Sequence, residues 1–429
     1  MNSLTDTSTN NKANLNIFAY PKQETSFGFD LSCGGPGARC RIHHIVKFES
    51  SDIESGVSEA ASWKKSLSSL IYTKNDHTSK SLLVFINPVS GSGQAVNIWK
   101  NEVNQVLMDG QAQVTSIITE SANHAKSYMQ TANIRDYDAV LSIGGDGLFY
   151  EILQGITMRS DKDSVLQSIA LVAIPGGTGN GLAKSVLFEC DETFTPVNAS
   201  YVALKGIDRP LDLSLVETKT QKQYSFLSLA WGLISDIDIL SESLRFWGET
   251  RLYIAAVYFI VQKKMYKGKL SYIPVDNETN KGLQGGAYQV TPFDQPFGLM
   301  NMMGFNNGSV VDVIEGDFVL FWAVQTSHAA GTMHSGPGVT LDDGVLTMMI
   351  IRNCSRCELL SLLLTIDEGK HVDEDKVEFI KAYAYRLEPI VFNSDADGIY
   401  SLDGEVVEYG PIQASVLPAA ARVASTKKP

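Results

Sequence analysis

Residues 141–155, LSIGGDGLFYEILQG, decide the fold because a glycine-rich turn joins an apolar run to an amphipathic pattern. The apolar run ends at Ile143, and Leu148, Ile152 and then Ile156 recur at helical spacing after it. A strand followed by a helix is the repeating unit of a parallel α/β sheet. The single acid of the turn, Asp146, lies where such sheets bind ligands, outside the carboxyl ends of the strands.

The same unit recurs on both sides of this stretch. Apolar runs at 82–86, 114–119, 138–143 and 169–174 alternate with helical stretches, so residues 81–206 are predicted to form an α/β domain, a parallel sheet with helices on both faces. Over residues 207–420, strand-like runs follow one another with few helices between them, which predicts a mainly β, sandwich-like domain.

Residues 1–80 form an N-terminal extension. Its first 40 residues are rich in Asn, Thr, Ser and Gly without periodicity, so we expect them to be mostly disordered. A strand-like stretch at 41–49 and a helix-like stretch at 58–71 follow. This piece is too small to be a domain by itself.

Composition and charge exclude several classes of function. With 35 basic and 48 acidic residues the net charge is −13, which argues against a nucleic-acid partner and against purely electrostatic binding to anionic lipid. The 5 cysteines are an odd, sparse set, typical of a reducing compartment. The first residues lack the apolar core of a secretory signal, and the longest apolar run, 252–261, is too short to span a bilayer. We therefore expect a cytoplasmic protein.

Four loops that follow predicted strands carry the polar residues of interest: 87–93 (NPVSGSG), 119–125 (TESANHA), 144–147 (GGDG) and 175–181 (PGGTGNG). Glycine-rich turns before helices let backbone N–H groups approach phosphate oxygens. Neither GxxxxGK[ST] nor GxGxxG occurs, so the sequence predicts a nucleotide held by a different set of loops.

Asp146 is the candidate for chemistry within these loops. Its carboxylate could serve as a general base for a substrate hydroxyl or as part of a Mg²⁺ site. The alternative is an aspartate that only caps the following helix. A second glycine-rich loop one strand later favours the functional interpretation.

The joint pattern of NPxSGxG, GGDG and PGGTGN resembles the catalytic domain shared by diacylglycerol, ceramide and sphingosine kinases. Residues 228–251, 381–389 and 401–405 resemble the sphingosine (long-chain base) kinases in particular, and the resemblance extends over about residues 80–415. It implies a lipid kinase that uses ATP and Mg²⁺ to phosphorylate the primary hydroxyl of sphingosine or a related long-chain base, giving sphingosine 1-phosphate. In that resemblance Asp146 is the general base.

The resemblance also assigns the other residues of the site. It implies that ATP is held by Asn87, Ser90, Gly91, Thr119, Asn123, His124, Gly177, Thr178, Arg245, Arg251, Asp403, Gly404 and Glu405, with Asp403 and Glu405 also at the metal. Asp238 would meet the amine of the long-chain base, because a cation in an apolar pocket requires a nearby anion. The remaining lipid-binding residues implied are Ser228, Leu233, Ile234 and Ile237.

Other interpretations stay open from the sequence. A ceramide or diacylglycerol kinase would share this fold, and so would a non-catalytic lipid-binding scaffold. Because long-chain bases partition into bilayers, we expect peripheral membrane contact, for which Ile254, Val257 and Tyr258 are candidates; the alternative for them is an ordinary buried helix. The oligomeric state is left open.

Overall fold

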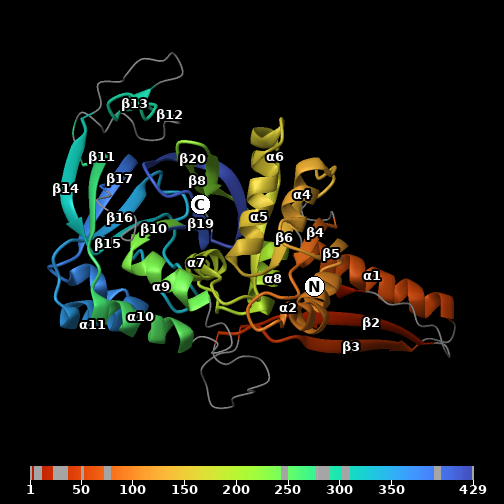
Figure 1. Cartoon of the computed structure of the whole chain (residues 1–429). Helices are drawn as coiled ribbons and strands as arrows, with labels where there is room; N and C mark the ends of the chain where they lie inside the picture. Colours follow the sequence, from red (N-terminus) through yellow and green to blue (C-terminus); the bar gives the residue numbers. More distant parts are fainter. Residues whose placement is uncertain are drawn as a thin grey trace.

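The computed structural model describes residues 2–3, 12–22, 37–49, 53–71, 79–242, 250–276, 278, 289–300, 310–390 and 398–427. Residues 79–206 form an N-terminal lobe of strands and helices, and residues 207–427 form a C-terminal lobe rich in strands. Figure 1 shows the two lobes side by side, with the N-terminal extension beneath the N-terminal lobe.

The N-terminal lobe is built on four parallel strands in the order β5-β4-β6-β7. The strands are β4 (Ser81–Ile86), β5 (Gln113–Ile118), β6 (Ala139–Gly144) and β7 (Ala170–Pro175). The three inner strands are almost entirely buried, as expected for strands covered on both faces, whereas the edge strand β5 is mostly exposed. The predicted apolar runs therefore become strands within one residue of their expected bounds.

Helices cover both faces of this sheet, which confirms the predicted architecture. Alternate side chains of β4 point to opposite faces: Leu83 and Phe85 pack with α4, α5 and α6, and Leu82 and Val84 pack with the helices of the other face. The helices are α2 (Ala95–Ile98), continued by a π-helical turn (Trp99–Val103) and α3 (Asn104–Asp109), α4 (His124–Thr131), α5 (Asp146–Thr157), α6 (Lys162–Ser168), α7 (Gly181–Glu189) and α8 (Pro196–Lys205).

The C-terminal lobe is mainly antiparallel β-structure, as predicted. Its strands are β8 (Ile207–Glu217), β9 (Lys222–Ser225), β10 (Ser228–Gly232), β11 (Tyr266–Pro274), β12 (Gln289–Val290), β13 (Leu299–Met300), β14 (Asp312–Phe318), β15 (Leu320–Val324), β16 (Leu346–Ile351), β17 (Glu378–Pro389), β18 (Tyr400–Leu402), β19 (Glu405–Val407) and β20 (Ile412–Ser425). Three α-helices lie between these strands in the described residues: α9 (Leu233–Glu242), α10 (Thr250–Gln262) and α11 (Arg356–Thr365). Two 3₁₀ turns, Ile366–Glu368 and Lys370–Asp373, follow α11.

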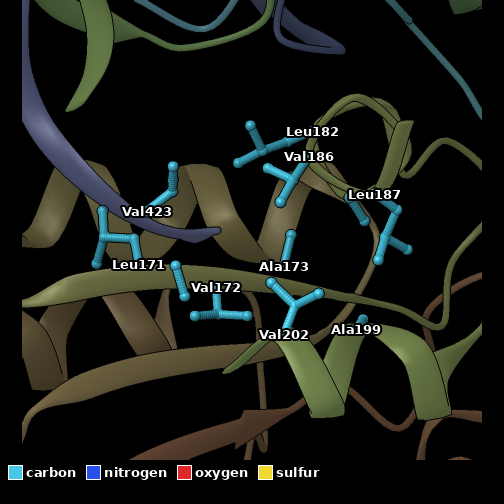
Figure 2. A pocket seen from close by; sticks show the side chains of 11 residues that line it. Leu171, Val172, Ala173, Leu182, Val186, Leu187, Ala199, Val202 and Val423 are labelled. Carbon is cyan, nitrogen blue, oxygen red and sulfur yellow. The ribbon is translucent and has the colours of Figure 1, made fainter. Parts of the chain in front are cut away.

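Strand β20 joins the two lobes into one hydrogen-bonded sheet. Its first part pairs with β17 of the C-terminal lobe, and its last part runs parallel to β7, with Arg422 opposite Ala170. The pairing of β20 with β8 shifts register between Leu417 and Ala421, where the strand bends. Figure 2 shows the result at the junction, where Val186 of α7 lies above Ala173 of β7, with Val423 of β20 nearby.

The N-terminal extension differs from expectation in one part. Lys12–Ala19, within the stretch expected to be disordered, forms strand β2, which pairs with β3 (Ile42–Glu49); a two-residue strand, β1 (Asn2–Ser3), pairs with β2. The partner of β2 lies more than twenty residues away in the chain, so local composition gives no sign of it. Helix α1 (Ile53–Ile71) contains the predicted helix.

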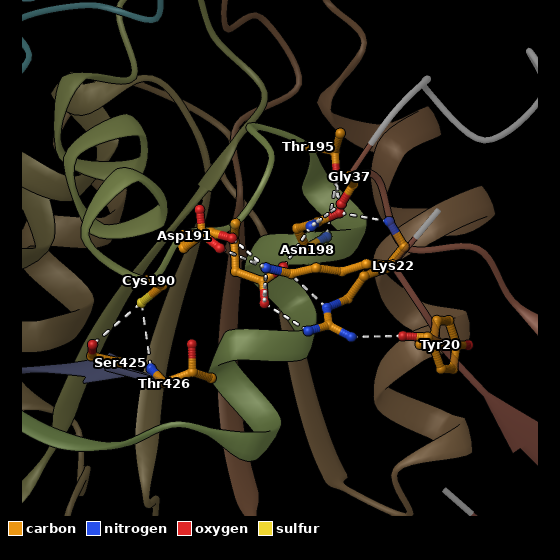
Figure 3. Close-up of polar contacts among 11 residues, drawn as sticks. Tyr20, Lys22, Gly37, Cys190, Asp191, Thr195, Asn198, Ser425 and Thr426 are labelled. Carbon is orange, nitrogen blue, oxygen red and sulfur yellow. Dashed lines mark hydrogen bonds and ion pairs between the residues drawn. The ribbon is translucent and has the colours of Figure 1, made fainter. Parts of the chain in front are cut away.

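Polar contacts fix this extension to the N-terminal lobe. Tyr20 and Arg41 both donate to Asp109 at the end of α3, each at 2.6 Å, and Arg39 donates to Glu192 at 2.6 Å. Figure 3 shows Lys22 directed toward Asp191, and Asn198 of α8 beside Gly37. The extension is therefore bound to the end of α3 and to the loop between α7 and α8 by charge-assisted hydrogen bonds, and to Asn198 of α8 by neutral ones.

Two expectations drawn from composition concern membranes and cysteines. None of the helices in the described ranges is both long and apolar enough to cross a bilayer. Cys40 is in a disulfide, whereas Cys190, Cys354 and Cys357 are free thiols. The disulfide departs from the expectation of reduced cysteines, because a count of cysteines does not reveal which of them the fold brings together.

Candidate active site

Asp146 lies at the first position of α5, directly after the turn that ends β6. Its side chain does not cap α5. Instead, the carboxylate accepts the backbone N–H of Gly181 at 2.8 Å and that of Leu182 at 3.3 Å, which are the first two residues of α7. The positive end of a second helix therefore holds the acid in place.

The environment of Asp146 sets its acidity. The residue is only 8% exposed, and burial raises its pKa to about 6, against the opposing effect of hydrogen bonds from Gly181 and Leu182. A carboxylate with this pKa is mostly ionised at neutral pH, yet it binds a proton more strongly than an exposed aspartate. Asp146 therefore has the property that a general base requires.

The glycine-rich loops at 87–93, 144–147 and 175–181 pack directly on one another. Gly145 donates its N–H to Ser90 Oγ at 2.8 Å. A Cβ placed on Gly177 would lie 2.4 Å from Cα of Gly145, and one on Gly91, whose φ is +55°, would lie 2.9 Å from the carbonyl carbon of Gly177. At positions 91 and 177 glycine is thus required by contacts between loops, a reason that the loop sequences alone do not reveal.

Asn87 and Asn180 give these loops their shape. Asn87 Oδ1 accepts the N–H of Val89 at 3.1 Å, which makes a tight turn after β4. Asn180, with φ of +59°, accepts the N–H of Gly177 at 3.1 Å and donates Nδ2 to the carbonyl oxygen of Gly177 at 2.6 Å. Asn180 is not among the residues predicted from the sequence, although an Asn-Gly pair before a helix is a known signal for a left-handed residue.

The loop after β5 lies beside the first glycine-rich loop, because β4 and β5 are adjacent. Thr119 is buried and donates its N–H to the carbonyl oxygen of Ile86 at 2.9 Å. Asn123 adopts a left-handed conformation, and Nδ1 of His124 accepts the N–H of Glu120 at 3.1 Å. In a neutral ring this bond places the proton of His124 on Nε2, which can donate to a ligand.

Asp403 has a different environment from the one expected for a metal ligand. It is 2% exposed, and its carboxylate accepts four bonds: from Ser225 Oγ at 2.7 Å and from the N–H groups of Phe226, Leu227 and Ser228 at 3.1, 3.0 and 2.9 Å. Oδ1 accepts three of these bonds and Oδ2 accepts one, so both oxygens are engaged. Burial raises the pKa of Asp403 to about 7, so the hydrogen bonds only partly offset the loss of solvent.

Glu405, by contrast, is exposed and faces the loop at 144–147. A Cβ placed on Gly147 would lie 3.3 Å from Oε1 of Glu405, so this carboxylate from the C-terminal lobe stands over the start of α5. Gly404 between the two acids has a φ of +88° and is exposed. Within the described residues, no three His, Cys, Asp or Glu side chains are grouped to hold a metal. A Mg²⁺ ion here would need phosphate oxygens and water to complete its six ligands.

The predicted lipid-binding residues lie on β10 and α9. Asp238 is half-buried on α9, and its Oδ2 accepts a hydrogen bond from Ser401 Oγ at 2.7 Å. Ser401 is two residues before Asp403, and Ser228, at the start of β10, bonds Asp403 through its backbone. The structure therefore connects the acid expected at the amine with the turn formed by Asp403, Gly404 and Glu405, named here the DGE turn, which reaches Gly147 through Glu405.

An apolar cavity opens beside this helix. Its accessible volume is only about 20 Å³, and Leu233 and Ile234 of α9 line it together with side chains of β15, β16, α11 and the turns after α11. Ile237 is 6% exposed and packs in the same apolar cluster, without lining the cavity. The described lining includes His371 and no acidic residue.

The structure does not describe the side chains of two of the predicted residues. Arg245 lies outside the described residues. Arg251 belongs to α10, but its side chain also lies outside them. Between the lobes, Glu405 lies against Gly147 of the loop at 144–147, and Ser401 and the backbone of Ser228 connect Asp238 to Asp403.

Comparisons with known proteins agree with this architecture. The Diacylglycerol kinase catalytic domain family matches residues 81–216, and the YegS C-terminal NAD kinase beta sandwich-like domain family matches residues 305–425. A putative diacylglycerol kinase from Bacillus anthracis str. Sterne has the same fold, with a TM-score of 0.57, 18% identity, and coverage of 83% of this chain and 99% of that chain. At this identity the structural likeness concerns the fold alone.

Sequence similarity to individual relatives shows which family of kinases with this fold includes the chain. Sphingosine kinase 2 of Arabidopsis thaliana is 30% identical over 339 residues, covering 77% of this chain and 70% of that protein. Sphingosine kinase 1 of Mus musculus is 30% identical over 346 residues, covering 79% and 89%, and Sphingosine kinase 1 of Homo sapiens is 29% identical over 354 residues, covering 79% and 88%. The chain therefore belongs to the sphingosine kinase family and is an enzyme with a catalytic domain of the diacylglycerol kinase type.

Proposed function

We propose that this enzyme transfers the γ-phosphate of ATP to the primary hydroxyl of sphingosine or a related long-chain base, giving sphingosine 1-phosphate. The observation that carries the proposal is the position of Asp146, a buried carboxylate with a raised pKa at the junction of three glycine-rich loops and the DGE turn. Phosphoryl transfer depends on positioning and charge stabilisation, and this junction offers both.

In the proposed reaction Asp146 takes up the proton of the lipid hydroxyl. The hydroxyl oxygen forms a bond to the γ-phosphorus as the bond from that phosphorus to the β–γ bridging oxygen breaks, and ADP leaves. The backbone N–H groups of the loops at 87–93 and 175–181 would contact phosphate oxygens. Removing a general base from such a reaction typically lowers the rate about 10²- to 10⁴-fold.

ATP would be held by the residues around these loops. The candidates are Asn87, Ser90, Gly91, Thr119, Asn123, His124, Gly177, Thr178, Arg245, Arg251 and Gly404. Arginines suit this task because their directed hydrogen bonds neutralise charge on phosphoryl oxygens. Glu405 is the residue that would hold Mg²⁺, which when bound neutralises charge on the phosphates, whereas the four bonds of Asp403 support a role in shaping the DGE turn.

The lipid would lie in the C-terminal lobe. Asp238 would pair with the amine of the long-chain base, because an ammonium group leaving water requires an anion close by. Ser401, which already donates to Asp238, would hold that carboxylate in one orientation. Ser228, Leu233, Ile234 and Ile237 would form a wall beside the tail, and the apolar cavity lined by Leu233 and Ile234 would have to widen to admit it.

We further propose that the C-terminal lobe contacts the bilayer through α10 and α11. Ile254, Val257 and Tyr258 of α10 are 45%, 55% and 51% exposed, and Leu360 and Leu364 of the neighbouring α11 are 43% and 68% exposed. Leu359, Leu362 and Leu363 of α11 line the cavity from the other side of that helix. An apolar surface next to an apolar cavity suits a substrate that is extracted from a membrane.

The experiment that tests the function is a substrate panel. The purified protein is incubated with γ-labelled ATP, Mg²⁺ and micelles that contain sphingosine, ceramide or diacylglycerol, and the labelled lipid is identified by chromatography. We expect label in the sphingosine product alone. Label in ceramide or diacylglycerol instead would favour another lipid kinase, and no labelled lipid would favour a non-catalytic scaffold.

A variant of Asp238 tests the proposed contact with the amine of the long-chain base. Asp238→Asn keeps an acceptor for Ser401 but removes the charge, so the KM for sphingosine should rise about tenfold or more while the KM for ATP stays the same, as expected for loss of a charge-assisted contact. Asp317→Asn, at an exposed position of β14, is the control. An unchanged KM for sphingosine in Asp238→Asn would contradict the assignment of the amine site.

A further inference from the structure

Helix α7 belongs to the N-terminal lobe by sequence, but a segment of the C-terminal lobe holds it. We name residues 327–334 the clamp loop. Gly331 of this loop donates its N–H to the carbonyl oxygen of Gly179 at 2.9 Å. The backbone of Ala329 lies so close to Gly181 that a Cβ on Gly181 would be 2.7 Å from its carbonyl carbon. The clamp loop therefore contacts the residues that begin α7.

Ser185 makes the central bond of this contact. Its side chain is fully buried, and its Oγ accepts the N–H of His328 at 3.0 Å while donating to the carbonyl oxygen of Gly181 at 2.9 Å. One hydroxyl thus connects the clamp loop to the residue whose N–H binds Asp146. Both bonds are inaccessible to water, so no solvent molecule can replace them at low cost.

Ring contacts extend the clamp along the helix. The rings of His328 and His334 stack with centroids 4.4 Å apart and an angle of 4° between their planes, and Phe188 of α7 packs against them at 4.9 and 5.4 Å. Burial lowers the pKa of both histidines, so the stacked rings are neutral at physiological pH. Near the end of α7, Glu189 accepts the N–H of Leu341 at 3.0 Å. The helix is therefore held at several points along its length.

We propose that Ser185, through its bond to the clamp loop, is a positioning residue for Asp146. The inference rests on the proposed role of Asp146 as general base. The carboxylate is bound by the first two N–H groups of α7, so a displacement of the first helical turn displaces the carboxylate with it. Through this arrangement the C-terminal lobe, in which the lipid would bind, fixes the base that acts on the lipid.

The first test compares two buried serines. Ser185→Ala removes the bond to His328, and we expect kcat to fall by about tenfold with little change in either KM, since small displacements of a catalytic group have effects of this order or larger. Ser200→Ala is the matched control, because Ser200 is equally buried and donates to the carbonyl four residues earlier, Pro196, without contact to the clamp loop. Thermal unfolding checks that both variants are folded at the assay temperature.

The decisive test is a double-mutant cycle with Asp146→Asn. If Ser185 acts through Asp146, then adding Ser185→Ala to Asp146→Asn should change kcat by less than about twofold, because coupled residues are not additive. A further tenfold loss in that background would overturn the inference and leave the role of Asp146 intact, as would a normal kcat in Ser185→Ala alone. Near-normal activity of Asp146→Asn alone would overturn both the inference and the proposed role of Asp146.

Discussion

The carboxylate of Asp146 and the backbone nitrogen of Gly181 lie 2.8 Å apart, so the acid that follows β6 is held by the helix that follows β7. A Cβ on Gly179 would lie 2.9 Å from Oδ2 of Asp146, which leaves no room for a side chain between them. The loop at 175–181 therefore serves two purposes: it packs against the other glycine-rich loops, and it brings the start of α7 to the acid.

Replacement of Asp146 tests its role as the base. Asp146→Asn keeps the size of the side chain and should lower kcat about 10²- to 10⁴-fold. The measurement is steady-state turnover of sphingosine at saturating ATP. Asp163→Asn, at an exposed position in α6, should leave turnover unchanged. A drop of less than about threefold for Asp146→Asn, well below the range for a general base, would contradict the assignment.

The raised pKa of Asp146 predicts the acid side of the pH profile. The base must be ionised to accept a proton, and its pKa is about 6 because burial disfavours the charged form. We expect kcat/KM for the lipid to be constant above pH 7 and to fall about tenfold per pH unit below pH 6. ATP and Mg²⁺ are kept saturating at every pH. The residual activity of Asp146→Asn should not show this decline, and a decline centred near pH 4 in the native enzyme would be inconsistent with a buried base.

Variants of Asp403 and Glu405 should affect different properties, the stability of the fold for Asp403 and the binding of Mg²⁺ for Glu405. Asp403→Ala leaves four buried donors without an acceptor, so the free energy of unfolding should fall by at least about 3 kcal/mol. Glu405→Ala, at an exposed position, should change it by less than about 0.5 kcal/mol but raise the Mg²⁺ concentration needed for half-maximal activity. Denaturant unfolding and Mg²⁺ titration of activity measure the two effects. Equal stability of the two variants would show that the hydrogen bonds of Asp403 contribute little to the free energy of unfolding.

A pair of glycine variants distinguishes loop packing from phosphate access. In Gly177→Ala the new Cβ would lie 2.4 Å from Cα of Gly145, whereas in Gly145→Ala it would lie 3.5 Å from Ser90 Oγ, an ordinary contact. If glycine is needed mainly for packing between the loops, Gly177→Ala should raise the KM for ATP and lower Tm. Gly145→Ala should then change both quantities much less. Similar loss of ATP binding in both, with Tm unchanged, would instead favour close approach of phosphate to bare backbone.

Much of the fold could be predicted from local patterns. The buried runs of β4, β6 and β7 are apolar on both faces, and glycine-rich turns mark where each run ends. Asp146 could also be identified from the sequence, because it is the one acid in such a turn. Strand β2 could not be predicted in this way, because its pairing partner β3 lies beyond a long stretch of polar sequence. Strand β20 was likewise not expected to reach β7, since a sheet neighbour can come from any part of the chain.

The sequence by itself determined which residues carry acids, amides and bare backbone at the strand ends, because those properties belong to single residues and short turns. Only the tertiary structure decided what each acid does. Asp146 holds a helix 35 residues away, Asp238 accepts from a serine 163 residues away, and Asp403 binds a turn about 175 residues away. Such bonds depend on how the lobes pack, and packing is a property of the whole chain that no local spacing contains.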